Sequence, residues 1–218
     1  MAEPTESEAR TPRERYRAQV REEIKKHAWE QIASAGASAL SLNAIAKQIG
    51  VSGPALYRYY ASRDDLITEL IRDAYRSLAD TFRAHAVAGT DLAGLADALR
   101  HWALADPQRY FLIYGTPVPG YEAPEDTVQT SSEIMSVILA ACAAEPQPAT
   151  TTPLDDHLAE HRVWAREAKV PPAALSRALA FWTRLHGALS LELAGHFTGM
   201  GFDAAELYRA ETRTLTGP

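Results

Sequence analysis

Nine residues between positions 41 and 63 are suited to contact with a polyanion, because their side chains either donate hydrogen bonds or are small enough to allow a close approach. They are Ser41, Lys47, Ser52, Gly53, Pro54, Tyr57, Arg58, Tyr59 and Arg63. Hydroxyl, ammonium and guanidinium groups donate hydrogen bonds to phosphate oxygens and to base edges. A small residue such as Gly53 allows a close approach to the floor of a groove. These residue types indicate a non-covalent binding site for nucleic acid.

Covalent and metal chemistry have no comparable pattern in the sequence. It contains no nucleophile elbow, no glycine-rich phosphate loop and no paired Cys/His ligand set. His157 and His161 lie four residues apart beside Asp155, Asp156 and Glu160, a spacing that could hold a metal. The same spacing is typical of a charged, exposed helix face, which we prefer. We therefore predict no catalytic residue, no metal and no cofactor, and a protein that is not an enzyme.

Two short helices and a tight turn are expected to position the candidate contacts. Ser41 is a good N-cap for a helix over 42–49, which Gly50 ends, and Ser52 begins a second short helix with Pro54 in its first turn. The apolar residues expected to pack inward are Ile45, Ile49, Leu56 and Tyr60. Such a pair forms a helix-turn-helix, whose second helix can enter a major groove about 12 Å wide. Periodicity alone favours two ordinary core helices, because such pairs occur in many helical proteins.

The rest of the chain predicts an all-α fold of eight to ten helices, because no stretch alternates with period two over six residues. A first helix, with a stripe from Tyr16 to Ile32, should end near Gly36. Pro117, Pro119 and Pro124 predict a loop over 115–126. The remaining helices are expected over 62–88, 91–105, 108–114, 128–144, 154–169, 172–197 and 203–215.

Composition and charge indicate a globular protein with a basic leading segment. The 218 residues are 46% hydrophobic and 23% charged, and they include one cysteine, Cys142, which excludes an internal disulfide framework. No transmembrane span or secretory signal is expected, so we predict a cytoplasmic location. The net charge is −6, yet residues 1–63 hold ten Lys/Arg and seven Asp/Glu. This distribution fits a local phosphate-binding patch on an acidic body, or a solvated helix face of mixed charge.

The segment Ser41–Leu66, SLNAIAKQIGVSGPALYRYYASRDDL, closely resembles the signature of the tetracycline-repressor-like (TetR) family of bacterial transcription regulators. The resemblance extends upstream through 24–36. Three positions depart from the usual pattern: Tyr60 replaces Phe, Arg63 replaces Lys, and Gly53-Pro54 replaces a bulkier or basic helix start. The last departure gives shape readout a larger share. Residues 181–187, 191–192 and 195–197 also resemble a Trp-His-Gly type of C-terminal domain in that family.

The resemblance implies a ligand-responsive homodimer, usually a repressor, that binds a double-stranded DNA operator and an unknown small-molecule effector, without a membrane. It corresponds to an N-terminal arm and DNA-binding domain over 1–62, a linking helix over 63–89, and an effector-binding and dimerisation domain over 90–218. An activator of the same family, or a helical small-molecule binding protein that does not bind DNA, are the alternatives.

Two further sets of candidates come from helix faces in the second part of the chain. Soft and aromatic residues fit an effector pocket, since ligand pockets are largely apolar, although each also fits plain core: Trp102, Tyr110, Phe111, Tyr114, Met135, Phe181 and His186. The helix after Pro172 is apolar on most sides, and either its own chain or a two-fold partner could cover it. We expect this helix and the last one to build a four-helix bundle with a second copy of the chain. The expected interface residues are Leu175, Trp182, Leu189, Leu193, Leu207 and Tyr208.

Overall fold

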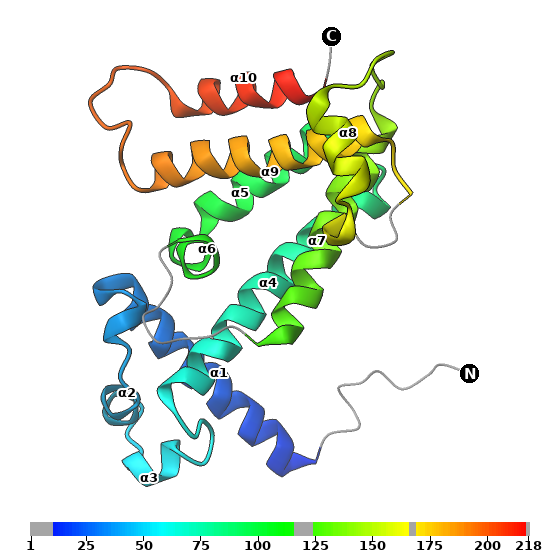
Figure 1. Cartoon of the computed structure of the whole chain (residues 1–218). Helices are drawn as coiled ribbons and strands as arrows, with labels where there is room; N and C mark the ends of the chain where they lie inside the picture. Colours follow the sequence, from blue (N-terminus) through cyan, green and yellow to red (C-terminus); the bar gives the residue numbers. More distant parts are fainter. Residues whose placement is uncertain (1–10, 116–123, 166–168, 217–218) are drawn as a thin grey trace. The chain divides into compact units, whose positions relative to one another are not determined.

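A computed structural model describes residues 11–115, 124–165 and 169–216, and all regular elements in this part are helices (Figure 1). The helices are α1 (Pro12–Ala35), η1 (Ala37–Ala39), α2 (Leu42–Gln48), α3 (Gly53–Leu56), α4 (Arg63–Val87), α5 (Leu92–Ala105), α6 (Pro107–Tyr114), α7 (Glu125–Ala144), α8 (Pro153–Glu160), η2 (Val163–Ala165), α9 (Pro172–Leu193) and α10 (Ala204–Thr216). The predicted all-α class is thus confirmed.

The described residues form two compact units that divide inside α4, between Leu70 and Ile71. The first unit contains α1, η1, α2, α3 and the start of α4, and the second contains the rest of α4 and all later helices. Because α4 is one continuous helix of 25 residues, it belongs to both units.

The first unit is built on the apolar stripe of α1, whose Ile24, Ala28 and Ile32 are buried. Residues from α2, α3, α4 and the segment between α3 and α4 complete this core: Leu42, Ile45, Ala46, Leu56, Tyr60, Leu66, Ile67 and Leu70. The predicted cap at Ser41 is present, because its side chain accepts from a backbone N–H group in the first turn of α2, and Thr11 caps α1 in the same way. Gly36 ends α1 with a positive φ of 78°, as expected for a helix-terminating glycine.

The second unit surrounds α9, which packs against α5, α7, α8 and α10. Figure 1 shows α9 and α10 side by side. The largest fully buried side chains of this unit include Phe82, Leu92, Tyr110, Phe181 and Tyr208. Burying aromatic side chains of this size removes much apolar surface from water, which is the main favourable term in folding.

Several sequence expectations differ from the structure, some in the position of helix ends and some in the exposure of single residues. The helix predicted over 154–169 ends at Glu160, where His161 adopts a non-helical conformation and η2 follows. Asp155, expected on an exposed face, is buried because it caps α8 and accepts from the Ser176 hydroxyl. Tyr16, placed on the buried stripe, is 64% exposed. Most of the loop predicted over 115–126 lies outside the described residues, and α7 begins at Glu125, three residues earlier than expected.

One helical segment within the described part, Thr127–Ala144 of α7, is long and apolar enough to cross a membrane by length and composition alone. Its Ile134, Ile138, Leu139 and Cys142 are buried in the core of the second unit. Core helices of globular proteins have the same composition, so length and composition do not distinguish a membrane-spanning helix from a core helix here.

Candidate functional site

The α2–turn–α3 segment has the geometry of the predicted helix-turn-helix. Ile45 and Leu56, one on each helix, are fully buried, and they join α2 and α3 to a common core. Gly50 lies in the turn with a positive φ of 73°, a conformation that side chains with a Cβ rarely adopt. Pro54 occupies the first turn of α3, where its missing N–H costs no hydrogen bond. The turn and the two helices therefore form one rigid element.

The nine predicted contact residues divide by exposure. Exposed to solvent are Lys47, Ser52, Pro54, Tyr57 and Arg58, and half-buried are Ser41, Gly53, Tyr59 and Arg63. Tyr57 is 46% exposed at the C-terminal end of α3. Of the exposed side chains that donate hydrogen bonds, Lys47 thus lies on α2, and Tyr57 and Arg58 directly follow α3. This face can contact phosphates and base edges without unfolding.

Ser41 and Tyr59 have structural roles in addition to any contact role. Ser41 Oγ accepts from the backbone N–H of Ala44 at 3.3 Å, so it caps α2. The carbonyl of Tyr59 accepts from Arg21 Nη1 at 3.1 Å, and the Arg17 guanidinium lies 5.8 Å from the centre of the Tyr59 ring. These contacts fix the chain that follows α3.

Two arginines of α1 hold the end of the helix-turn-helix, a role that the sequence analysis missed. Arg21 pairs with Glu69 and lies over the Tyr60 ring at 4.5 Å, and the Tyr60 hydroxyl donates to Glu69 Oε1 at 2.9 Å. Arg17 Nη2 donates to the carbonyl of Arg58 at 3.4 Å. Carbonyls at the end of a short helix lack intrahelical partners, and these cations supply them. Part of the basic run on α1 is therefore structural.

Arg63 lies at the first position of α4 and is tied to its own chain. Its Nη2 donates to the carbonyl of Ala37 at 2.9 Å and its Nη1 lies 3.3 Å from Asp64 Oδ1. Its Nε is buried and has no hydrogen-bond partner among the described residues. Arg63 therefore joins α4 to η1, and positioning of the helix-turn-helix is part of its role.

The predicted effector residues differ in burial. Trp102, Tyr110 and Phe181 belong to the closed core, whereas Phe111, Tyr114, Met135 and His186 are partly exposed. The indole N–H of Trp102 donates to Ser77 Oγ at 3.1 Å. Three of the predicted residues do meet in an aromatic cluster, defined here as Tyr75, Tyr110, Tyr114, Trp182 and His186, on α4, α6 and α9.

His186 lies at the centre of the aromatic cluster. Its ring centre is 4.3 Å from those of Tyr114 and Trp182, and it stacks on Tyr110 at 5.6 Å. The Tyr110 hydroxyl donates to the backbone carbonyl of His186 at 3.1 Å, and lies 2.8 Å from Ser190 Oγ and 3.1 Å from His186 Nδ1. Ser190 follows His186 by four residues and so shares its helix face, which is the signal that could have identified it.

Two polar atoms of the cluster are buried without a partner among the described residues: Tyr114 Oη and His186 Nε2. Each such group costs about 1–3 kcal/mol of stability when nothing satisfies it. Burial lowers the pKa of His186 to about 4, so its ring is neutral at neutral pH. Burial also raises the pKa of Tyr114 well above its ordinary value, so its hydroxyl stays protonated. Both groups are therefore neutral and can form hydrogen bonds.

The predicted dimer contacts are wrong for Leu175, Leu189 and Tyr208, because all three are fully buried within their own chain. Their partners come from the same unit. Tyr208, for example, donates its hydroxyl to the carbonyl of Ala96 at 2.8 Å. Trp182, Leu193 and Leu207 remain partly exposed and stay candidates.

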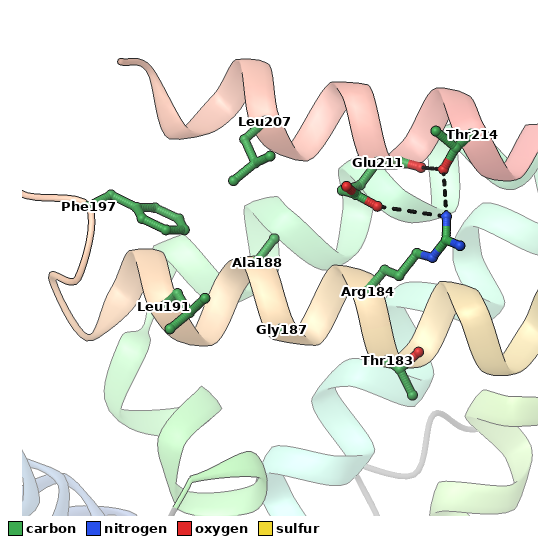
Figure 2. A pocket seen from close by; sticks show the side chains of 9 residues that line it. All are labelled: Thr183, Arg184, Gly187, Ala188, Leu191, Phe197, Leu207, Glu211 and Thr214. Carbon is green, nitrogen blue, oxygen red and sulfur yellow. Dashed lines mark hydrogen bonds and ion pairs between the residues drawn. The ribbon is translucent and has the colours of Figure 1, made fainter. Parts of the chain in front are cut away.

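An open groove of about 610 Å³ runs along α9 and α10, and we call it the α9–α10 groove. Figure 2 shows its lining, which consists of Thr183, Arg184, Gly187, Ala188, Leu191, Phe197, Leu207, Glu211 and Thr214. Arg184 donates to Thr214 Oγ1 at 3.0 Å at one end of the groove, and apolar side chains line the other end. Of the predicted interface residues, Leu207 lies in this groove.

Comparison with known proteins gives a consistent result over nearly the whole chain. Residues 24–70 match the family model described as bacterial regulatory proteins, tetR family, and residues 92–215 match the tetracyclin repressor-like C-terminal domain. HTH-type transcriptional regulators of Mycobacterium tuberculosis and Mycobacterium bovis are 34% identical over 215 residues, covering 91% of this chain and 92% of theirs.

Solved structures extend the similarity to the fold. The regulatory protein SCO4313 is 68% identical, with a TM-score of 0.88 over 95% of this chain and all of that one. A TetR/AcrR-family regulator from Thermobifida fusca is 21% identical, with a TM-score of 0.58 over 91% of this chain and 97% of that one, which supports the fold.

Proposed function

The chain belongs to the tetracycline-repressor-like (TetR) family of bacterial transcriptional regulators, and from that premise we propose that it is a homodimeric repressor released from its operator by a small molecule. It is a DNA-binding transcriptional regulator and not an enzyme. Such a regulator acts on chromosomal DNA, which in bacteria is in the cytoplasm.

The observation that carries the proposal is the exposed face of α2 and α3. Lys47, Tyr57 and Arg58 are exposed on a segment that Arg17, Arg21 and buried core residues hold in place. A rigid element with exposed cations is what phosphate contacts require, and its small Gly53 permits close approach to the duplex. Two copies in a dimer would bind a pseudo-palindrome whose half-sites lie about one helical turn or somewhat more apart.

The α9–α10 groove supports the homodimer. Its exposed apolar residues include Leu191, which is 45% exposed, and exposed Met200 and Phe202 lie in the turn between the two helices. Contiguous apolar surface on a protein favours a contact with another surface. In a two-fold dimer the same groove of each copy would meet its counterpart.

Effector response is proposed to act through α4, which belongs to both units. Tyr75 of α4 contacts Tyr114 of α6 with ring centres 6.1 Å apart. A ligand beside Tyr114 would favour one position of Tyr75, and hence of α4, over another. Such a ligand shifts the population only through different affinities for the DNA-bound and the released conformation.

Fluorescence anisotropy with the DNA upstream of the protein's own gene tests the proposal. We expect tight binding that weakens steeply with salt, because phosphate contacts release counterions. Tyr57→Ala and Arg63→Ala should each weaken binding while the circular dichroism spectrum stays helical. Arg83→Ala, an exposed arginine of the second unit, is the matched control and should bind normally. Salt-independent binding, or equal loss in the control, would contradict the proposal.

Repressor and activator differ in transcript level when the gene is deleted. A repressor predicts higher transcript from the bound promoter, and an activator predicts lower transcript. Failure of any double-stranded fragment to bind would favour the remaining alternative, a helical small-molecule binding protein.

A further inference from the structure

The aromatic cluster contains two of the three buried side-chain atoms that lack a hydrogen-bond partner in the described part of the chain. They are Tyr114 Oη and His186 Nε2, and their rings are in contact at 4.3 Å. Buried polar groups in folded proteins are nearly always paired, so two neighbouring unpaired groups need an explanation. Ordered water or a bound molecule can supply both partners, and the aromatic side chains around the two atoms favour a molecule with an apolar body.

The Tyr110 hydroxyl lies within hydrogen-bond distance of two atoms of His186, the backbone carbonyl oxygen and the ring Nδ1. The Tyr110 hydroxyl has one proton, which it can donate to the carbonyl of His186. His186 Nδ1 lies 3.1 Å from Tyr110 Oη, and which of the two atoms donates depends on the His186 tautomer. Nε2 therefore presents either a lone pair or an N–H, and a ligand hydroxyl, which both donates and accepts, can pair with it in either tautomer. Tyr114, a protonated phenol, can both donate and accept.

The side chains around Tyr114 and His186 restrict the chemistry of the rest of the ligand. Trp182 and Tyr75 both make edge contacts with Tyr114, with ring centres 5.4 Å and 6.1 Å from its own, so the neighbouring surface is aromatic. Aromatic side chains of this kind bind flat apolar bodies by stacking and edge contacts. Tyr114 and His186 are both uncharged at neutral pH, so an ionised head group would find no opposite charge on either of them.

We propose that Tyr114 and His186 together bind the hydroxyl group of an uncharged, largely apolar small molecule, a phenol or an alcohol. The ligand hydroxyl forms hydrogen bonds with both His186 Nε2 and the Tyr114 hydroxyl, while its apolar body contacts Trp182 and Tyr75. This inference rests on the proposed function, since it names the chemical class of the effector.

The first test compares two tyrosines of the same helix without any ligand. Tyr110→Phe removes a hydroxyl with partners, so the melting temperature should fall. Tyr114→Phe removes a buried hydroxyl without a partner, so the melting temperature should stay or rise. An equal fall in both variants would show that the Tyr114 hydroxyl already has a protein partner, which overturns the proposal.

The second test uses matched probes on the full-length protein in isothermal titration calorimetry. Phenol, 4-propylphenol and 2-naphthol carry the hydroxyl, and toluene, propylbenzene and naphthalene lack it. We expect the best hydroxyl probe to bind at least tenfold more tightly than its hydrocarbon counterpart. Tyr114→Phe and His186→Phe should each remove most of that difference, and Tyr57→Phe in the first unit should not.

Three results would overturn the proposal: no binding of any hydroxyl probe, equal binding of phenols and hydrocarbons, or tighter binding of phenyltrimethylammonium, which would indicate a cation site. Operator release is measured separately by anisotropy. A phenol that binds through Tyr114 and His186 without releasing DNA leaves this site intact and contradicts the proposed effector response. A molecule that releases DNA independently of both residues supports the response and overturns this site.

Discussion

The polar side chains of the α2–α3 segment and those of the aromatic cluster differ in where their hydrogen-bonding atoms lie. In the first unit, Lys47, Tyr57 and Arg58 are exposed to solvent, and nearby Arg17 and Arg21 are bonded to backbone carbonyls. In the second unit, the polar atoms of Tyr114 and His186 are buried among rings and lack a partner in the described part of the chain.

This difference predicts two kinds of recognition. Exposed cations attract a highly charged partner from a distance and lose affinity as salt screens them. Buried neutral donors and acceptors bind only a partner that replaces water and matches their hydrogen bonds. The first unit therefore suits DNA, and the second suits a small uncharged molecule.

The largest expected effect on stability distinguishes the buried face of α9 from its exposed face. Leu189→Glu should cost about 4 kcal/mol or more, because Leu189 is fully buried and a carboxylate there has no partner. Leu191→Glu, two residues later and exposed in the α9–α10 groove, should keep the helical fold and give monomers. Urea unfolding and sedimentation velocity measure the two effects. A folded dimer for Leu191→Glu would place the interface elsewhere.

A pH titration of stability tests whether the His186 side chain is shielded from water. Its folded pKa of about 4 lies below the usual unfolded value near 6.5, so the unfolded chain binds the proton more readily. The free energy of unfolding should therefore fall as the pH is lowered from about 6.5 to 4, by at most about 3 kcal/mol. His186→Phe should show a flatter dependence in this window. Identical pH profiles would mean that His186 is accessible to water.

Removal of an exposed cation of the first unit should have a smaller effect, a loss of operator affinity that depends on the salt concentration. Arg58→Ala should weaken operator binding about tenfold at low salt and reduce the salt slope by about one phosphate contact. Ligand binding in the second unit should not change, because it involves neutral groups. Anisotropy and calorimetry over the same salt series measure both, and a salt-dependent ligand affinity would contradict the comparison.

The smallest effect concerns the turn between α2 and α3. Gly50→Ala should destabilise the chain by about 1 kcal/mol, because alanine rarely adopts a φ of 73°. Gly53→Ala is the matched control: its Cβ would meet only Asn43 Oδ1 at 3.4 Å, an ordinary contact. The control should keep its stability and lose operator affinity if the backbone of α3 lies close to DNA. Thermal melts and anisotropy separate the two outcomes.

Local signals in the sequence predicted most helix positions. Gly36 and Gly50 marked helix ends that the structure has, and Ser41 marked a cap. These features depend on neighbours within a few residues, so the amino-acid order determines them. The end of α8 was missed because no glycine or proline marks it; His161 leaves the helix without a sequence signal.

Side-chain partners could not be predicted in the same way. The apolar faces of α9 and α10 placed Leu175, Leu189 and Tyr208 on a dimer face, yet all three are buried within their own chain. An apolar helix face fits an internal neighbour and an external partner equally, so periodicity cannot distinguish them.

The sequence by itself determined most of the helices and the cap at Ser41, because these depend on short-range backbone preferences and apolar spacing, and the resemblance to the TetR family identified the helix-turn-helix. Only the tertiary structure decided that Arg21 and Arg63 hold the chain around the DNA-contacting segment, and that Tyr114 and His186 come together without partners. These relations join residues 26 to 72 positions apart, and only packing, through which side chains exclude water and one another, brings such residues together.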